Sequence, residues 1–187
     1  MKQALLIIDV QNAYFKNGKC ELHHPEIALA AVKELQKWFR QKELPIYYVQ
    51  HISRESADFF LPGTEGAELA EALHPRNNEK IIQKRHPNAF LDTELQMLLS
   101  EAGITDLVIC GMMTHMCVDT TVRAAYDLGC QVTLISDACA TRPLFWNGEE
   151  IPADVVQRVF LASMDGIFAG IMTAGEFLAE QGTRSSK

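Results

Sequence analysis

The hydrophobic positions of the chain fall into two kinds of segment. Short runs rich in apolar and β-branched residues predict strands at 3–9, 44–51, 80–85, 106–110, 131–136 and 167–173. Between them, apolar residues at helical spacing predict helices at 26–42, 65–73, 91–102, 117–128, 152–165 and 174–180. Turn residues agree with these limits, because Gly103 and Gly129 follow two of the helices and Pro152 opens another.

Strands that alternate with helices predict parallel pairing through right-handed crossovers. We therefore expect an α/β fold: a doubly wound, mostly parallel six-stranded sheet in the order 3-2-1-4-5-6, with helices on both faces and three α/β/α layers. The 187 residues suffice for one sizeable core. The expected organisation is a single domain over 1–180, followed by a polar C-terminal tail at 181–187.

The composition is that of an ordinary globular protein, with 48% hydrophobic and 22% charged residues and a net charge of −7. No basic run is interleaved with aromatic residues, so we expect no nucleic-acid partner. The longest apolar runs are far below the roughly 18 residues that span a bilayer, so no membrane partner is expected. The first residues are too short for a secretory signal, which favours the cytoplasm. The five cysteines include no C-x-x-C pair and are expected to be free thiols.

Three reactive side chains follow three of the predicted strands. Asp9 ends the first strand, Lys84 lies at the end of the third, and Cys117 follows the fourth at the start of a helix. In open α/β sheets, ligands bind beyond the carboxyl ends of the strands. We therefore expect these residues, although far apart in sequence, to meet at one edge of the sheet.

Together these groups could carry out nucleophilic catalysis. The amides at the start of a helix and a nearby ammonium both favour a thiolate, so we expect Lys84 and the helix to activate Cys117. Asp9 would accept the thiol proton and return it to a leaving group, and helix-start amides would stabilise an oxyanion. Taken singly, each has an ordinary structural explanation: a capping aspartate, a surface lysine and a packing cysteine.

Three stretches carry a family resemblance. They are "LLIIDVQNAYF" at 5–15, the lysine of "IIQKRHPNAF", and "VICGMMTHMCVDTTVRAAYDLG" at 108–129. In order and spacing they resemble the isochorismatase-like cysteine hydrolases, which include nicotinamidases, N-carbamoylsarcosine amidohydrolases and ureidoacrylate amidohydrolases. The resemblance extends from residue 5 to about residue 178.

The resemblance implies a role for each matching residue. Asp9 would be the general base and acid, Lys84 the stabiliser of the thiolate, and Cys117 the nucleophile. It also implies a cis peptide between Met112 and Met113, which would direct the Met113 amide, alongside that of Cys117, at the oxyanion.

Six further residues are candidates for substrate binding. Gln11 matches the D-x-Q motif and is expected to support Asp9, and Tyr14 matches a wall of the pocket. The full set of substrate-binding candidates is Gln11, Tyr14, His115, Phe59, Phe60 and Trp146. Aromatic residues at these places are equally typical of a core or a subunit contact.

The chain lacks two motifs, one for a metal site and one for a dinucleotide cofactor. Nicotinamidases bind a metal through D-x-H after the second strand, where this chain reads "YYVQHISRESADFF" with only His51. We therefore expect no metal site, which disfavours nicotinamide as the substrate, and we interpret His51 as a pocket or packing residue. No G-x-G-x-x-G motif follows the first strand, so we expect no dinucleotide and no other cofactor.

The resulting hypothesis is a cysteine hydrolase that cleaves an amide or ureido C–N bond of a small molecule. A second hypothesis is hydrolysis of an isochorismate-like vinyl ether with Asp9 as the acid and Cys117 incidental. A third, of another class, is a redox-responsive or ligand-binding protein that uses Cys117. Relatives form dimers or tetramers, so a homo-oligomer is expected.

Overall fold

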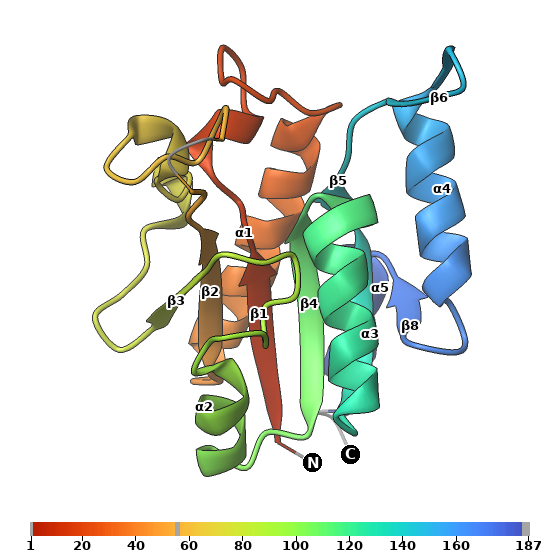
Figure 1. The fold of residues 1–187 in the computed structure, drawn as a ribbon. Coiled ribbons are helices and arrows are strands. Elements are labelled where there is room, and N and C mark those ends of the chain that lie inside the picture. The colour runs from red at the N-terminus through yellow and green to blue at the C-terminus, as the bar shows by residue number, and fades with distance from the viewer. Residues whose placement is uncertain (1, 55–56, 185–187) are drawn as a thin grey trace.

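The computed structural model describes residues 2–54 and 57–184, and within them it contains the expected parallel sheet (Figure 1). Six strands pair in the order β3-β2-β1-β4-β5-β8, and all neighbours are parallel. They are β1 (Gln3–Ile8), β2 (Ile46–His51), β3 (Lys80–Lys84), β4 (Asp106–Met112), β5 (Gln131–Ala140) and β8 (Gly170–Met172). The predicted fold and strand order are confirmed, since β8 is the sixth strand along this sheet.

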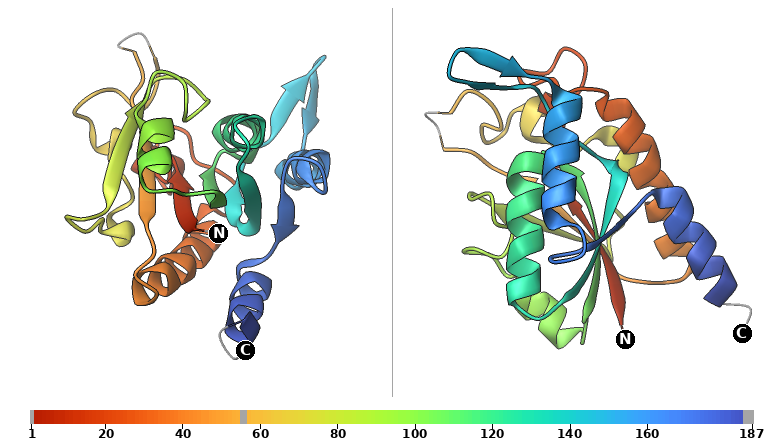
Figure 2. Two further views of the ribbon diagram at one scale, coloured as in Figure 1. Left: turned by 90° about the horizontal axis from the view of Figure 1, so that it is seen from below. Right: turned by 90° about the vertical axis from the view of Figure 1, so that its right-hand side faces the viewer.

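Helices cover both faces of the sheet (Figure 2). They are α1 (Pro25–Gln41), α2 (Leu95–Glu101), α3 (Asp119–Asp127), α4 (Ala153–Met164) and α5 (Ala174–Arg184). Side chains of α1 and α5 belong to one buried cluster, and those of α2, α3 and α4 to another. No helix among the described residues is long and apolar enough to cross a membrane.

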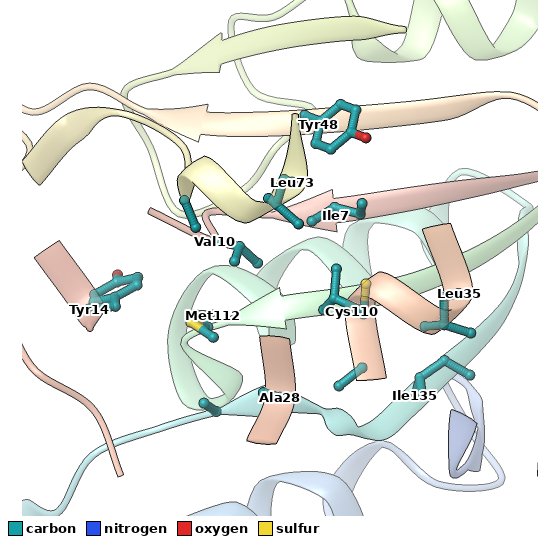
Figure 3. Packing of buried hydrophobic residues seen from close by; sticks show 14 of the residues in the cluster. Ile7, Val10, Tyr14, Ala28, Leu35, Tyr48, Leu73, Cys110, Met112 and Ile135 are labelled. Carbon is teal, nitrogen blue, oxygen red and sulfur yellow. The ribbon is translucent and has the colours of Figure 1, made fainter. Parts of the chain in front are cut away.

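After Gln3, strand β1 is apolar and buried on both faces. Successive side chains of a strand point to opposite sides. Accordingly, Ile7 joins the cluster beneath α1, whereas Leu6 and Ile8 join the cluster beneath α2 and α3. Figure 3 shows Ile7 and its neighbours on the α1 side, with Leu35 of that helix among them. The sheet is thus the rigid centre of the fold.

Two segments differ from the predicted elements. Residues 65–73 form two short 3-10 turns, Glu65–Ala67 and Glu71–Leu73, in place of one helix. Residues 144–151, where the sequence pattern predicts neither a strand nor a helix, form an antiparallel hairpin of β6 (Leu144–Trp146) and β7 (Glu149–Ile151). Its turn is Asn147-Gly148, both with positive φ, which is the pairing that a tight hairpin turn requires.

The C-terminal helix continues beyond its predicted end. Helix α5 extends to Arg184, so part of the segment expected to be a polar tail is helical. Residues 185–187 of that segment lie outside the described residues.

Candidate active site

Asp9, Lys84 and Cys117 lie together at the carboxyl edge of the sheet. Asp9 directly follows β1, Lys84 ends β3, and Cys117 lies in a π-helical turn, Thr114–Val118, between β4 and α3. Lys84 Nζ is 2.7 Å from Asp9 Oδ2 and 3.2 Å from Cys117 Sγ. The residues are 0, 1 and 5% exposed, in the order Asp9, Lys84, Cys117, so the cluster is shielded from bulk water.

The backbone at Asp9 and Gly111 brings the ends of β1 and β4 close together beside the cluster. Asp9 has φ of 49°, a left-handed conformation that aspartate tolerates better than most residues, and its amide donates to Val49 O at 3.0 Å. Gly111 on β4 lies opposite Ile8 and has φ of 131°. A Cβ at Gly111 would overlap the carbonyl oxygen of Ile8, so only glycine fits between these strands.

The turn that carries Cys117 is anchored at both ends. The peptide between Met112 and Met113 is cis. The Met113 carbonyl accepts hydrogen bonds from the amides of Met116 (3.0 Å) and Val118 (3.2 Å). Thr114 Oγ1 lies 2.7 Å from the side-chain oxygen of Gln157 on α4. These contacts hold the thiol above the end of β1.

Burial dominates the electrostatics of the cluster. It raises the pKa of Asp9, an effect that Lys84 only partly offsets. Burial also raises the pKa of the Cys117 thiol; the Asp9 charge adds to this, while Lys84 opposes it. Burial alone would lower the pKa of Lys84, but the charges of Asp9 and Cys117 raise it, so Lys84 remains an ammonium.

The raised pKa of Cys117 corrects an expectation from the sequence. From the sequence we expect a thiol whose ionisation is favoured, because a helix start and a lysine both stabilise the thiolate. In the structure the pKa of Cys117 is raised, since burial and the neighbouring carboxylate outweigh the lysine. Cys117 therefore rests as a thiol, and Asp9 and Cys117 share one proton beside a fixed ammonium.

His51, interpreted from the sequence as a pocket or packing residue, belongs to the cluster through a contact with Lys84 that the sequence did not predict. In the register of β2 and β3, His51 lies directly beside Lys84, and its Nδ1 is 2.8 Å from Lys84 Nζ. Burial, followed by the charges of Lys84, His86 and Arg85, lowers the pKa of His51 to about 4. The available signal was its place at the end of β2, between the strands of Asp9 and Lys84.

Gln11 supports His51 instead of Asp9. Its side-chain oxygen accepts from the His51 amide at 2.8 Å, and its side-chain nitrogen donates to His51 O at 2.9 Å and to Ala67 O at 2.7 Å. Gln11 is buried, with both amide hydrogens and the oxygen engaged. It therefore positions the end of β2, and its amide is not free to bind a substrate.

Tyr14, Phe59 and Phe60 form an aromatic group beside the cluster. Phe60 contacts Tyr14 edge-on, with ring centroids 4.9 Å apart, and Phe59 packs on Phe60 at 4.8 Å. Burial and then the charges of Asp9 and Cys117 raise the pKa of Tyr14, which shows that its ring is near the reactive groups. Phe59 and Phe60 also line a cavity of about 510 Å³, which Asp9, Lys84 and Cys117 do not line.

The structure places two other candidates away from Lys84. The ring of His115 lies against Thr141 and, at 5.9 Å between centroids, against Phe160 of α4. Trp146 is 78% exposed on the β6–β7 hairpin. Neither residue contacts Asp9 or Lys84 within the part of the chain that the structure describes.

The fit of a metal ion can be tested against these contacts. Asp9, His51 and Cys117 offer ligand atoms that all lie within 4.8 Å of one another. However, the Lys84 ammonium contacts all three residues and already supplies the positive charge among them. A metal ion would have to displace this buried cation, so the residues do not fit a metal site while Lys84 is in place.

A carboxylate, an ammonium and a thiol at the carboxyl edge of a parallel α/β sheet are the groups that an enzyme with a cysteine nucleophile requires. Comparison with known proteins identifies the family. Residues 3–175 match the Isochorismatase domain. The chain therefore belongs to the isochorismatase family and is a hydrolase of that family.

Individual relatives agree with this assignment. The isochorismatase family protein YddQ of Bacillus subtilis is 43% identical over 95% of this chain and 99% of its own length. The crystal structure of an isochorismatase-type hydrolase from Oleispira antarctica is 39% identical, with a TM-score of 0.93 over 95% of this chain and 96% of that one. Streptothricin hydrolase of Streptomyces noursei is 35% identical over 74% of this chain and 50% of its own length.

Proposed function

We propose that this hydrolase cleaves an amide or ureido C–N bond of a small molecule, with Cys117 as the nucleophile. The observation that carries the proposal is the contact of one buried ammonium, Lys84, with both the Asp9 carboxylate and the Cys117 sulfur. Proton transfer from Cys117 to Asp9 leaves the net charge of this cluster unchanged. It also creates a thiolate beside a cation, which makes a strong nucleophile without exposing a charge to an apolar surrounding.

The first half-reaction forms a covalent intermediate. As Asp9 takes the thiol proton, the Cys117 sulfur bonds to the carbonyl carbon and the carbonyl electron pair moves to oxygen. The backbone amides of Met113 and Cys117 are the proposed donors to this oxyanion. Asp9 then gives its proton to the leaving nitrogen, the C–N bond breaks, and a thioester, or a thiocarbamate from a ureido group, remains on Cys117.

The second half-reaction regenerates the enzyme. Water attacks the carbonyl carbon as Asp9 accepts one of its protons. The C–S bond then breaks, and Asp9 returns the proton to the thiolate. The net change is addition of one water across the C–N bond. Lys84 keeps its three hydrogens throughout and stabilises whichever neighbour is negatively charged.

Low exposure of the cluster favours small substrates. Cys117 is only 5% exposed, and the ring of Phe60 packs against that of His51, which contacts Lys84. An enclosed site of this kind suits a small amide or ureido compound. The homo-oligomer and the cytoplasmic location expected from the sequence remain predictions, which sedimentation velocity and cell fractionation would test.

The raised pKa of Asp9 favours a second candidate. If the proton shared by Asp9 and Cys117 moves to Asp9, the buried carboxyl can act as an acid toward a vinyl ether, without any nucleophile. The low exposure and raised pKa of Cys117 speak against the redox-responsive alternative, which needs an accessible thiolate.

Ammonia and amine release from a panel of small amides and ureido compounds tests the proposal. The variant is Cys117→Ala, and Cys130→Ala, at a half-buried cysteine after α3, is the matched control. We expect Cys117→Ala to lose at least about a thousandfold in kcat and the control to match the parent. Undiminished turnover of an isochorismate-like vinyl ether by Cys117→Ala would instead establish the second candidate.

A further inference from the structure

We propose that His51 completes the site through both ring nitrogens: Nδ1 orients the Lys84 ammonium, and Nε2–H donates a hydrogen bond to an acceptor oxygen of the substrate. The part that concerns the substrate rests on the proposed function. The part that concerns Lys84 does not depend on it.

The first step is the tautomer of the His51 ring. An ammonium can only donate, so the 2.8 Å contact from Lys84 Nζ requires a lone pair on Nδ1. The lowered pKa of His51 makes the ring neutral near pH 7, and the single ring proton must then be on Nε2. The contact with Lys84 therefore makes Nε2 a donor.

The second step concerns the three hydrogens of the ammonium. Lys84 Nζ has three polar neighbours: Asp9, Cys117 and His51. By accepting one hydrogen, His51 leaves the other two for the carboxylate and the sulfur. Because β2 lies between β3 and β1, the Lys84 side chain must extend across β2 to reach Asp9, and His51 is the residue of β2 beside it.

The third step is that Nε2 is available. It makes no hydrogen bond with any described residue, yet it is not among the buried polar atoms left without a partner. The ring itself is held in place, because Gln11 binds both backbone groups of His51 and Phe60 packs 5.8 Å from its centroid. A fixed N–H that is not fully buried, on a ring beside the nucleophile, is suited to orienting a ligand.

The chemistry of this donor indicates the group it would bind. A His51 ring nitrogen, Cys117 Sγ and an Asp9 oxygen lie within 4.8 Å of one another. Nε2 belongs to the same ring as this nitrogen, so an oxygen bound to Nε2–H would belong to a part of the substrate close to the carbon under attack. Lys84, Arg85 and His86 make the surroundings of His51 electropositive, which favours a carbonyl or carboxylate oxygen. The substrate class is thus an amide or ureido compound with a second acceptor oxygen beside the scissile carbonyl.

Two substitutions of His51 test the roles of its two ring nitrogens separately. In His51→Asn, the amide can take the place of Nδ1 and accept from Lys84, but no donor remains at Nε2. In His51→Gln, the longer amide can place a donor near Nε2, but no acceptor remains for Lys84. Circular dichroism and thermal unfolding would establish that each variant folds.

Cys117 alkylation, read by peptide mass spectrometry with Cys130 as the internal reference, measures both effects without a substrate. Iodoacetamide carries a carbonyl beside the carbon attacked, and iodomethane does not. In His51→Asn, we expect the iodoacetamide-to-iodomethane rate ratio to fall about tenfold, the contribution of one ordinary hydrogen bond, with an unchanged pH profile. In His51→Gln, we expect the ratio to be kept and the pH of half-maximal alkylation to rise by about one unit.

The proposal fails in its substrate part if His51→Asn keeps the parent's rate ratio, and in its lysine part if the pH profile of His51→Gln matches the parent. A measurement on the unmutated protein stands apart from any folding defect: ¹⁵N NMR of labelled histidine near pH 7 should show His51 protonated at Nε2 only. A proton on Nδ1 would overturn both parts. Failure of the proposed function would show separately, as full turnover by Cys117→Ala.

Discussion

Lys84 Nζ lies 2.7 Å from Asp9 Oδ2, although the strand of His51 separates β3 from β1. Both side chains are fully buried, so each charge depends on the other for its compensation. A buried pair of this kind contributes little net stability over apolar residues, but its disruption leaves one charge without a partner.

The first prediction concerns this pair. Lys84→Met removes the ammonium but keeps most of the side-chain volume, and it should lower the free energy of unfolding by about 3–5 kcal/mol in urea titrations. Adding Asp9→Asn should restore part of the loss, because no uncompensated carboxylate then remains. Lys80→Met, at an exposed position of the same strand, is the control and should stay within about 0.5 kcal/mol of the parent. An equal loss in both lysine variants would contradict the pairing.

The second prediction separates thiol reactivity from catalysis. The Asp9 charge helps to raise the pKa of Cys117, so Asp9→Asn should lower that pKa and speed alkylation of Cys117 near pH 7. The same substitution removes the proton acceptor, and amide hydrolysis should fall by a factor of about 100–10,000. Alkylation and turnover should thus change in opposite directions. If both fall together, alkylation also depends on Asp9 as acceptor of the thiol proton, and the Asp9 charge does not control the reactivity of Cys117.

The third prediction concerns acid stability. The pKa of His51 is lowered from 6.5 to about 4 in the folded chain. The unfolded state therefore binds a proton at higher pH than the folded state does. The contribution of His51 to stability is complete above pH 6.5 and is lost as the pH falls from there toward 4. His51→Asn does not titrate, so its thermal midpoint should decline less steeply across this interval. Parallel curves for parent and variant would mean that His51 titrates alike in both states.

The fourth prediction concerns the approach of β4 to β1. Gly111→Ala should destabilise the protein by more than about 3 kcal/mol, because the added Cβ overlaps Ile8 O and φ of 131° strains any side chain. Gly103→Ala is the matched control. Gly103 also has positive φ, but a Cβ there meets nothing within 4 Å, so the cost should be about 1–2 kcal/mol. Urea unfolding of the two variants measures the difference.

The convergence of Asp9, Lys84 and Cys117 could be predicted because it depends only on topology. Asp9 directly follows β1, Lys84 ends β3 and Cys117 lies in the turn after β4, and the carboxyl ends of parallel strands meet at one edge. The pattern of apolar positions is sufficient to define such strands. It is a weaker guide to residues 65–73, where the chain forms 3-10 turns. The hairpin at 144–151 is indicated by its turn pair, Asn147-Gly148, and not by the apolar pattern.

The role of His51 and the raised pKa of Cys117 could not be predicted in the same way. The first depends on the register between β2 and β3, which decides that His51 and not Gln50 lies beside Lys84. The second depends on the balance of burial against two opposite charges. A sequence shows which groups are near a strand end but does not give their exposure. Gln11 illustrates the same point, because its partners come from residues 51 and 67.

The parallel sheet also determines when this site can exist during folding. Its groups come from β1, β2, β3 and the turn after β4, so the cluster forms only after four strands have paired through long crossovers. Such non-local pairings form slowly compared with helices and hairpins. Recovery of Cys117 shielding during refolding should therefore report completion of the central sheet and should lag behind the return of helical circular dichroism. An N-terminal fragment that ends before β4 would hold Asp9 and Lys84 but would lack the nucleophile Cys117.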